Sequence, residues 1–78
     1  MSAGLYSLSA GATDPQEPHN EDEAYYVISG RAAVDIGGQV QTVESGSVIF
    51  VAAHVEHRFV DIQEDLEVLV LFAPAETS

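Results

Sequence analysis

Short apolar stretches rich in β-branched residues alternate with glycine-containing turns along this chain, and this pattern constrains the fold more than any other feature. No window has the three-to-four-residue apolar spacing of an amphipathic helix. A helical fold would place Gly30, Gly37, Gly38 and Gly46 inside helices, at a cost of about 1 kcal/mol each. The sequence therefore predicts an all-β fold.

We expect about seven short antiparallel strands joined by turns. A two-residue hairpin turn is predicted at 37–38, a turn at 61–65, a loop at 11–18 and a polar tail from 74. Strands of this length and spacing are typical of a β-sandwich or a small barrel. A length of 78 residues predicts one domain, 1–78. The expected strands are 5–8, 24–28, 31–36, 39–43, 48–51, 57–60 and 66–72.

The chain has no cysteine, which excludes a disulfide and a zinc site built from thiolates. A core this small usually needs a metal, a disulfide or a partner subunit for stability. A metal held by histidine and carboxylate side chains, or association of subunits, therefore remains.

Thirteen acidic and two basic side chains give a formal net charge of -11. Nucleic-acid surfaces and anionic membranes bind through many Lys and Arg residues, so neither is an expected partner. At 46% hydrophobic residues the chain is too apolar for an acidic disordered segment. No apolar run approaches the roughly 18 residues of a membrane span, and no signal peptide is recognisable, so the expected location is the cytoplasm.

The last expected strand is apolar on both faces. Its alternate residues include Leu69 and Leu71, which a single small barrel would leave in water. Tyr26 and Ile28 lie on the corresponding face of another strand. These residues predict a homodimer in which a second copy covers the outer face; the alternative is a few scattered exposed apolar side chains.

Histidine and carboxylate residues precede the strongest strand. Glu17 and His19 project to one side of an extended chain, and Glu23 and Tyr25 keep the same parity. His57 opens a distant strand. Imidazoles and carboxylates that converge from two strands suit a divalent metal ion, whereas a solvated acidic loop is the alternative interpretation.

Two motifs in this chain resemble those of the cupin family. Glu23 and Gly30 fit the E-x6-G part of its first motif, and His19 stands four residues before Glu23. Gly46 and His57 keep the separation of the opening glycine and the terminal histidine of its second motif, G-x5-P-x-G-x2-H. The first motif covers about 11–30, the hairpin between the motifs 31–45, and the second motif about 46–61.

The resemblance implies a small jelly-roll barrel of seven to eight strands that holds one divalent metal ion, with His19, Glu23 and His57 as ligands. The family's first histidine falls on Glu17. Glu17 is then either a fourth ligand or a carboxylate that hydrogen-bonds to a ligand. A set of two histidines and two carboxylates favours Mn, Fe(II) or Zn over copper.

The chain departs from the second motif at its Pro-x-Gly turn, which falls on residues 52–54. His54 there is either relaxed or strained, and it is a proton shuttle, a surrogate ligand or an exposed loop residue. Tyr25 is expected to face inward, either lining a pocket or filling the core. Three further side chains are expected to form the barrel wall: Val27, Phe50 and Phe59.

The resemblance implies a metal-dependent enzyme for a small organic molecule, of dioxygenase or isomerase type. A non-catalytic barrel that binds a metal or a small ligand, such as a sensor, is the alternative. The chain has only two arginines that could hold an anionic substrate, and it has no general base beyond the ligands and His54. A metal-free dimeric barrel is the third interpretation. Fold resemblance alone does not choose among them.

Overall fold

A computed structural model describes residues 2–14 and 21–73, and this part of the chain contains strands and no helix. The strands are β1 Ser2–Leu8, β2 Asp22–Ile36, β3 Gln39–Glu44, β4 Val48–Val51 and β5 His57–Ala73. No helix long and apolar enough to span a membrane occurs among these residues. The predicted all-β, antiparallel fold is confirmed.

The seven predicted stretches all lie in strands, but two pairs of them are continuous. Stretches 24–28 and 31–36 join in β2, where the register with β5 shifts near Gly30. Stretches 57–60 and 66–72 join in β5, so the predicted turn at 61–65 is wrong. The polar segment stays extended because its backbone pairs with β2: Arg31 lies opposite Glu64, and Ala33 opposite Val60.

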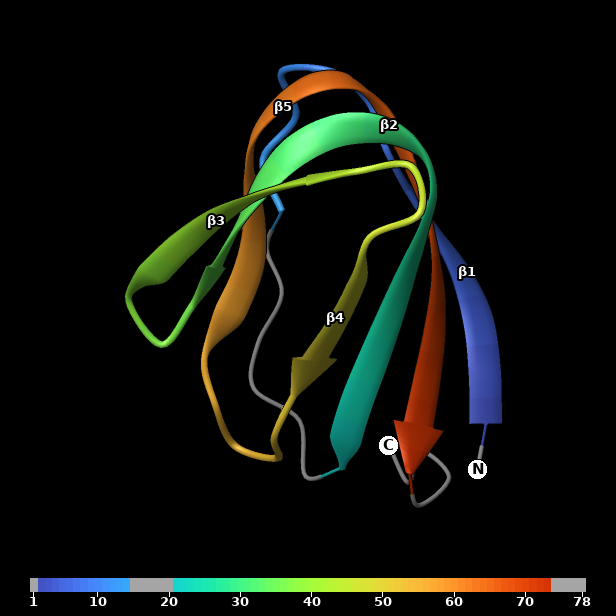
Figure 1. Ribbon diagram of the computed structural model, residues 1–78, viewed down its shortest axis with the longest axis vertical. Helices are drawn as coiled ribbons and strands as arrows, with labels where there is room; N and C mark the ends of the chain where they lie inside the picture. The colour runs from blue at the N-terminus through green and yellow to red at the C-terminus, as the bar shows by residue number, and fades with distance from the viewer. Residues whose placement is uncertain (1, 15–20, 74–78) are drawn as a thin grey trace.

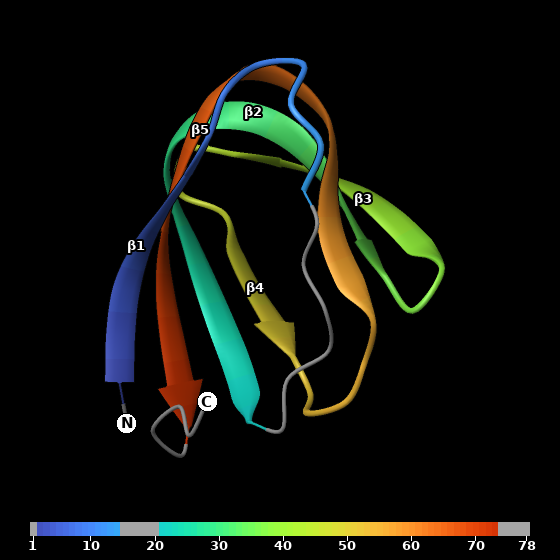
Figure 2. The same cartoon turned by 180° about the vertical axis from the view of Figure 1, so that it is seen from behind.

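The strands form one antiparallel sheet in the order β1-β5-β2-β3, with β4 also paired to β2 (Figure 1). The long strands β2 and β5 arch over together, so that their two ends run down on different sides of the molecule (Figures 1 and 2). This curvature turns a single sheet into a barrel. The predicted hairpin turn between β2 and β3 is confirmed, with both Gly37 and Gly38 at positive φ.

The core lies inside this curve, lined by alternate residues of each strand. Tyr25, Val27 and Phe59 are buried, as the sequence predicted. Phe50 is 66% exposed, so its predicted place in the barrel wall is wrong. Strand β4 is apolar at every position, and pairing with β2 turns Ile49 and Val51 inward, which leaves Phe50 outside.

Candidate metal centre

Glu23 and His57 meet inside the barrel. Glu23 lies near the start of β2, and His57 is the first residue of β5. Oε2 of Glu23 and Nε2 of His57 are 2.7 Å apart, with the two side chains 2% and 1% exposed. The two predicted ligands that the structure describes therefore converge at one buried point, although 34 positions separate them in the sequence.

A backbone contact orients the imidazole of His57. Its Nδ1 lies 2.8 Å from the carbonyl oxygen of Val55. A carbonyl oxygen only accepts hydrogen bonds, so Nδ1 carries a proton and donates it there. In the neutral ring Nε2 then carries the lone pair, on the side of the carboxylate of Glu23. Two acceptor atoms at 2.7 Å need a proton or a cation between them.

Tyr25 holds the other oxygen of the same carboxylate. Its hydroxyl donates to Oε1 of Glu23 at 3.2 Å. The ring lies 5.9 Å from the imidazole of His57 and makes an edge contact with Phe59 at 5.3 Å between centroids. Burial, and then the charge of Glu23, raise the pKa of Tyr25. The hydroxyl therefore stays a donor, and the structure places Tyr25 in the core, as the second of its two predicted roles has it.

A second buried carboxylate, Asp14, was not predicted from the sequence. It is 1% exposed. Its Oδ1 accepts from the Tyr6 hydroxyl at 2.6 Å, and its Oδ2 accepts from the backbone N–H of Phe59 at 2.8 Å. Glu21 is also buried. An acidic residue among turn residues is the usual sign of solvent exposure, so no local signal distinguishes Asp14 or Glu21 from an exposed acid.

Of the other predicted site residues, His54 is not brought to this point. Glu17 and His19 lie outside the described residues. His54 is exposed in the turn before β5, with φ of 67°, so it takes the strained alternative of the two predicted conformations. Within residues 2–14 and 21–73, no group of three or more His, Cys, Asp or Glu side chains could hold a metal ion. The described segments thus supply two of the expected donors, one nitrogen and one oxygen.

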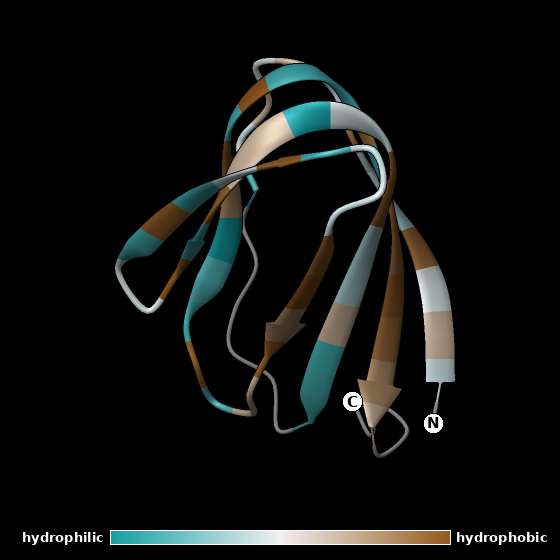
Figure 3. Ribbon diagram, in the orientation of Figure 1, coloured by the Kyte–Doolittle hydropathy of each residue, from teal (hydrophilic) through white to brown (hydrophobic). Residues whose placement is uncertain are grey.

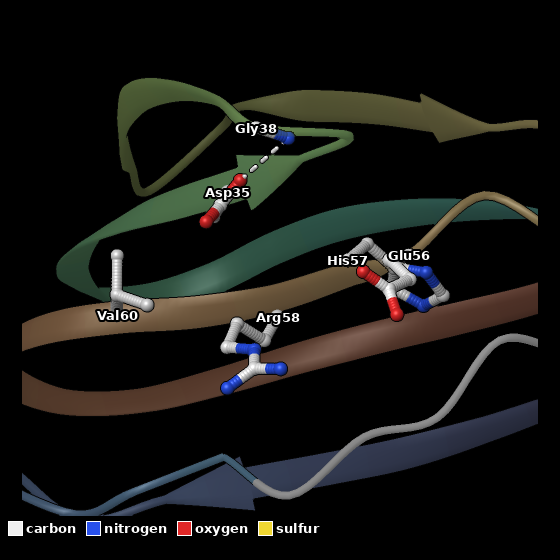
Figure 4. A pocket seen from close by; sticks show the side chains of 6 residues that line it. All are labelled: Asp35, Gly38, Glu56, His57, Arg58 and Val60. Carbon is white, nitrogen blue, oxygen red and sulfur yellow. Dashed lines mark hydrogen bonds between the residues drawn. The ribbon is translucent and has the colours of Figure 1, made fainter.

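A hollow of about 320 Å³ lies beside the start of β5 (Figure 4). Asp35 belongs to its wall and accepts a hydrogen bond from the Gly38 N–H at 3.0 Å, as the dashed line in Figure 4 shows. His57 also lines the hollow, although its side chain is 1% exposed. Its remaining walls are Glu56, Arg58 and Val60.

The family model of the cupin domain matches residues 4–73. The chain is a cupin. An uncharacterised protein of Streptomyces coelicolor is 54% identical over 99% of this chain and 73% of its own length. This relationship confirms the resemblance that the motifs indicated, including the small-barrel type.

Solved structures of cupin proteins have the same fold. A cupin 2 conserved barrel domain protein from Rhodopseudomonas palustris superposes over 95% of this chain with a TM-score of 0.84 and 19% identity. The DMSP lyase DddQ from Ruegeria pomeroyi superposes over 97% with a TM-score of 0.87 and 23% identity. This chain spans 52% and 40% of their respective lengths. At these identities the likeness shows the fold alone.

Proposed function

We propose that this cupin binds one divalent metal ion inside its barrel through Glu23 and His57, with His19 and Glu17 as the remaining candidate donors. The contact between Oε2 and Nε2 carries the proposal, because two acceptor atoms 2.7 Å apart are held together by a shared cation as well as by a shared proton. The other carboxylate oxygen of Glu23 accepts a hydrogen bond from Tyr25, and the other ring nitrogen of His57 donates to the Val55 carbonyl. Such outer contacts are typical of metal-binding residues.

The charge of the barrel interior also favours a cation. The buried ionisable groups of the described residues include three carboxylates, Asp14, Glu21 and Glu23. Both arginines of the chain, Arg31 and Arg58, are exposed. A divalent ion would offset the repulsion among these buried carboxylates. Imidazole with carboxylate donors suits Mn, Fe(II) or Zn.

The bound ion would supply Lewis acidity or an open position for a small oxygen-containing molecule. Among this chain's own residues, Tyr25 fixes the carboxylate and Phe59 packs against the ring of Tyr25. A small organic molecule of low charge fits this interior better than an anion does, because both arginines are exposed. As an enzyme, this cupin would carry out a reaction of the dioxygenase or isomerase type on such a molecule.

Non-catalytic binding is the second candidate function, and the position of His54 favours it. His54 was the candidate proton shuttle, but it is exposed in its turn. Tyr25 is a proton-carrying group that is hydrogen-bonded to Glu23, and its raised pKa makes it a poor general base. A barrel that senses a metal or a small ligand needs no such base.

Metal binding is tested by elemental analysis and by metal titration of EDTA-treated protein. We expect about one Mn, Fe(II) or Zn per chain and a rise in melting temperature of several degrees at saturating metal. His57→Ala and Glu23→Gln should weaken binding more than about 100-fold, and His19→Ala should do the same. Glu17→Gln distinguishes the two roles of Glu17. If Glu17 is a ligand, the loss of metal affinity should be comparable; if it only hydrogen-bonds to a ligand, the loss should be about 10-fold.

Two matched variants control for the loss of one histidine or one carboxylate elsewhere. His54→Ala and Glu64→Gln change exposed residues and should leave affinity within about 3-fold of the wild type. Circular dichroism checks that each variant is folded. A wild-type protein that neither retains metal nor gains thermal stability from added metal would contradict the proposal, as would equal affinity in His57→Ala and His54→Ala.

Turnover distinguishes the two candidate functions once the metal content is known. Oxygen uptake and product analysis with catechol-like, thiol and diketone compounds test the Fe(II)- and Mn-loaded protein. Product formation that disappears in Glu23→Gln supports the enzyme. Ligand-dependent stabilisation of the metal-loaded barrel without any product supports the non-catalytic module.

A further inference from the structure

The turn between β4 and β5, residues 52–56, leads directly to one of the two candidate ligands and starts beside the other. It follows Val51, which lies opposite Glu23 in the pairing of β4 with β2, and it ends at His57. Figure 3 shows the hydrophilic start of β2 and the apolar strand β4, and Figure 1 shows the chain turning back into β5 beyond the end of β4. Because His57 follows the turn directly, the conformation of the turn affects how its ring meets the carboxylate of Glu23.

This turn has little in its own sequence to keep it rigid. Residues 52–56 contain neither proline nor glycine, and His54 has a φ of 67°, in the left-handed region that side chains other than glycine seldom adopt. The backbone hydrogen bond within the turn, from the Val55 N–H to the Ala52 carbonyl, is long at 3.3 Å. A strained residue keeps its conformation only where contacts from the surrounding structure hold it. The turn therefore depends on a contact from outside it.

Asp22 makes such a contact. Its Oδ1 accepts a hydrogen bond from the backbone N–H of Ala53 at 2.8 Å, in a half-buried position and across 31 positions of the sequence. A hydrogen bond to a carboxylate is stronger than one between neutral groups. Asp22 is the first residue of β2 and the neighbour of Glu23. The end of β2 that carries one candidate ligand thus also holds the turn that leads to the other.

The contacts around the turn form a closed path. Asp22 holds the backbone at Ala53, and two residues later the carbonyl of Val55 accepts from Nδ1 of His57 at 2.8 Å. Nε2 of the same ring lies 2.7 Å from Oε2 of Glu23, and Glu23 follows Asp22 in the chain. A turn that shifts at Ala53 moves the Val55 carbonyl, and the ring that donates to this carbonyl moves with it.

We propose that Asp22 is a positioning residue, whose carboxylate fixes the turn at 52–56 so that the Val55 carbonyl holds the His57 ring against Glu23. Consecutive side chains of a strand point to opposite faces, so Asp22 acts on the site through the turn and not as a ligand beside Glu23. It acts as a hydrogen-bond acceptor, and an amide oxygen in the same place should therefore replace it. The effect on metal affinity rests on the proposed function, whereas the effect on the orientation of the ring does not.

Proton exchange at the His57 ring tests the orientation in EDTA-treated protein. NMR spectroscopy of ¹⁵N-labelled protein follows the Nδ1 proton that His57 donates to the Val55 carbonyl. We expect this proton to exchange with water at least about 10-fold faster in Asp22→Ala than in the wild type, because the carbonyl is no longer held in place. Asp22→Asn keeps an acceptor oxygen and should stay within about 3-fold of the wild type. Exchange at backbone amides of the core shows whether a general loss of stability contributes.

Asp65→Ala is the matched control for the loss of a carboxylate. Asp65 also accepts a hydrogen bond from a backbone N–H, that of Ala10 at 2.9 Å, and its removal changes the net charge by the same amount. Asp65 lies against Gly30, where the long strands bend, and not at the turn. Exchange of the Nδ1 proton of His57 in Asp65→Ala should therefore stay within about 3-fold of the wild type.

Titration with Mn or Zn measures the consequence for binding. Affinity should fall about 10-fold in Asp22→Ala and stay within about 3-fold of the wild type in Asp22→Asn and Asp65→Ala. Exchange at His57 that is the same in Asp22→Ala and Asp65→Ala would overturn the proposal, and so would an Asp22→Asn variant as fast as Asp22→Ala, since charge and not hydrogen bonding would then matter. A wild type that binds no metal would overturn the proposed function, and the exchange measurement would still decide the role of Asp22.

Discussion

At the scale of single residues, Asp14 links three parts of the barrel through one carboxylate. It accepts hydrogen bonds from the side chain of Tyr6 in β1 and from the backbone of Phe59 in β5, while itself lying between β1 and β2 in the sequence. The carboxylate is fully buried, and the bond from the Phe59 N–H is buried with it, whereas the bond from Tyr6 is half-buried. Removing the carboxylate would leave both donors without this acceptor.

We therefore expect Asp14→Ala to lower the free energy of unfolding by about 2–4 kcal/mol, measured by urea denaturation at fixed protein concentration. Asp65→Ala is the matched control. The carboxylate of Asp65 accepts a hydrogen bond from the backbone N–H of Ala10 at 2.9 Å, but in an exposed position. This substitution should lower the free energy of unfolding by no more than about 1 kcal/mol. Equal losses in the two variants would mean that burial of Asp14 has no energetic consequence.

At the scale of the elements, Gly30 allows β2 to bend while it stays paired with β5. Its φ is +100°, and an added Cβ would lie 2.3 Å from the backbone oxygen of Asp65 and 2.8 Å from Cα of Leu66. Both the backbone conformation and the close approach of β5 therefore require glycine. The register shifts on each side of this position are where the two long strands turn over the core.

Gly30→Ala should destabilise the fold by about 2–4 kcal/mol, because either the backbone of β5 must move or the substituted residue must leave the positive-φ conformation. Gly4→Ala is the control within β1, where an added Cβ meets nothing within 4 Å, and it should change stability by less than about 1 kcal/mol. Thermal melts at one protein concentration measure both. A similar melting temperature for the two variants would contradict the close approach at Gly30.

At the scale of the whole molecule, the alkaline side of the stability curve depends on tyrosine. The chain has no lysine and no cysteine, so tyrosine is the side chain that titrates around pH 10 and 11. Burial and the hydrogen bond to Asp14 raise the pKa of Tyr6 above its ordinary value of 10.0. Above pH 10 the unfolded chain then loses the Tyr6 proton while the folded chain keeps it, and the stability that is present below pH 10 declines.

Tyr6→Phe removes this linkage. Urea denaturation at pH 7 should show the variant less stable than the wild type, because the bond to Asp14 is lost. The difference between the two proteins should become smaller as the pH rises from about 9.5 to 11, since the wild type alone has the Tyr6 proton to lose. A constant difference across that range would show that the folded and unfolded states hold the Tyr6 proton equally well.

Much of the fold and half of the candidate site follow from local sequence. The two-residue alternation around Tyr25 and Val27 predicts which side chains are buried, and the paired glycines at 37–38 predict the hairpin, because both signals come from the backbone geometry of neighbouring residues. Motif spacing named Glu23 and His57, and the structure places them together. Their role as metal ligands, like that of His19 and Glu17, stays a prediction.

Long-range pairing decided the rest. Phe50 stands in a strand that is apolar at every position, so only its partner in β2 determines which residues face the core. Asp14 looks like any acid in a loop until Tyr6 and Phe59 are brought to it from distant strands. The sequence by itself determined which stretches are extended, the hairpin turn at 37–38 and the chemical types of the candidate ligands, because these depend on neighbours along the chain. Only the tertiary structure decided which carboxylates are buried, where the two long strands bend and which apolar residues remain outside, because these depend on contacts between residues far apart in the sequence.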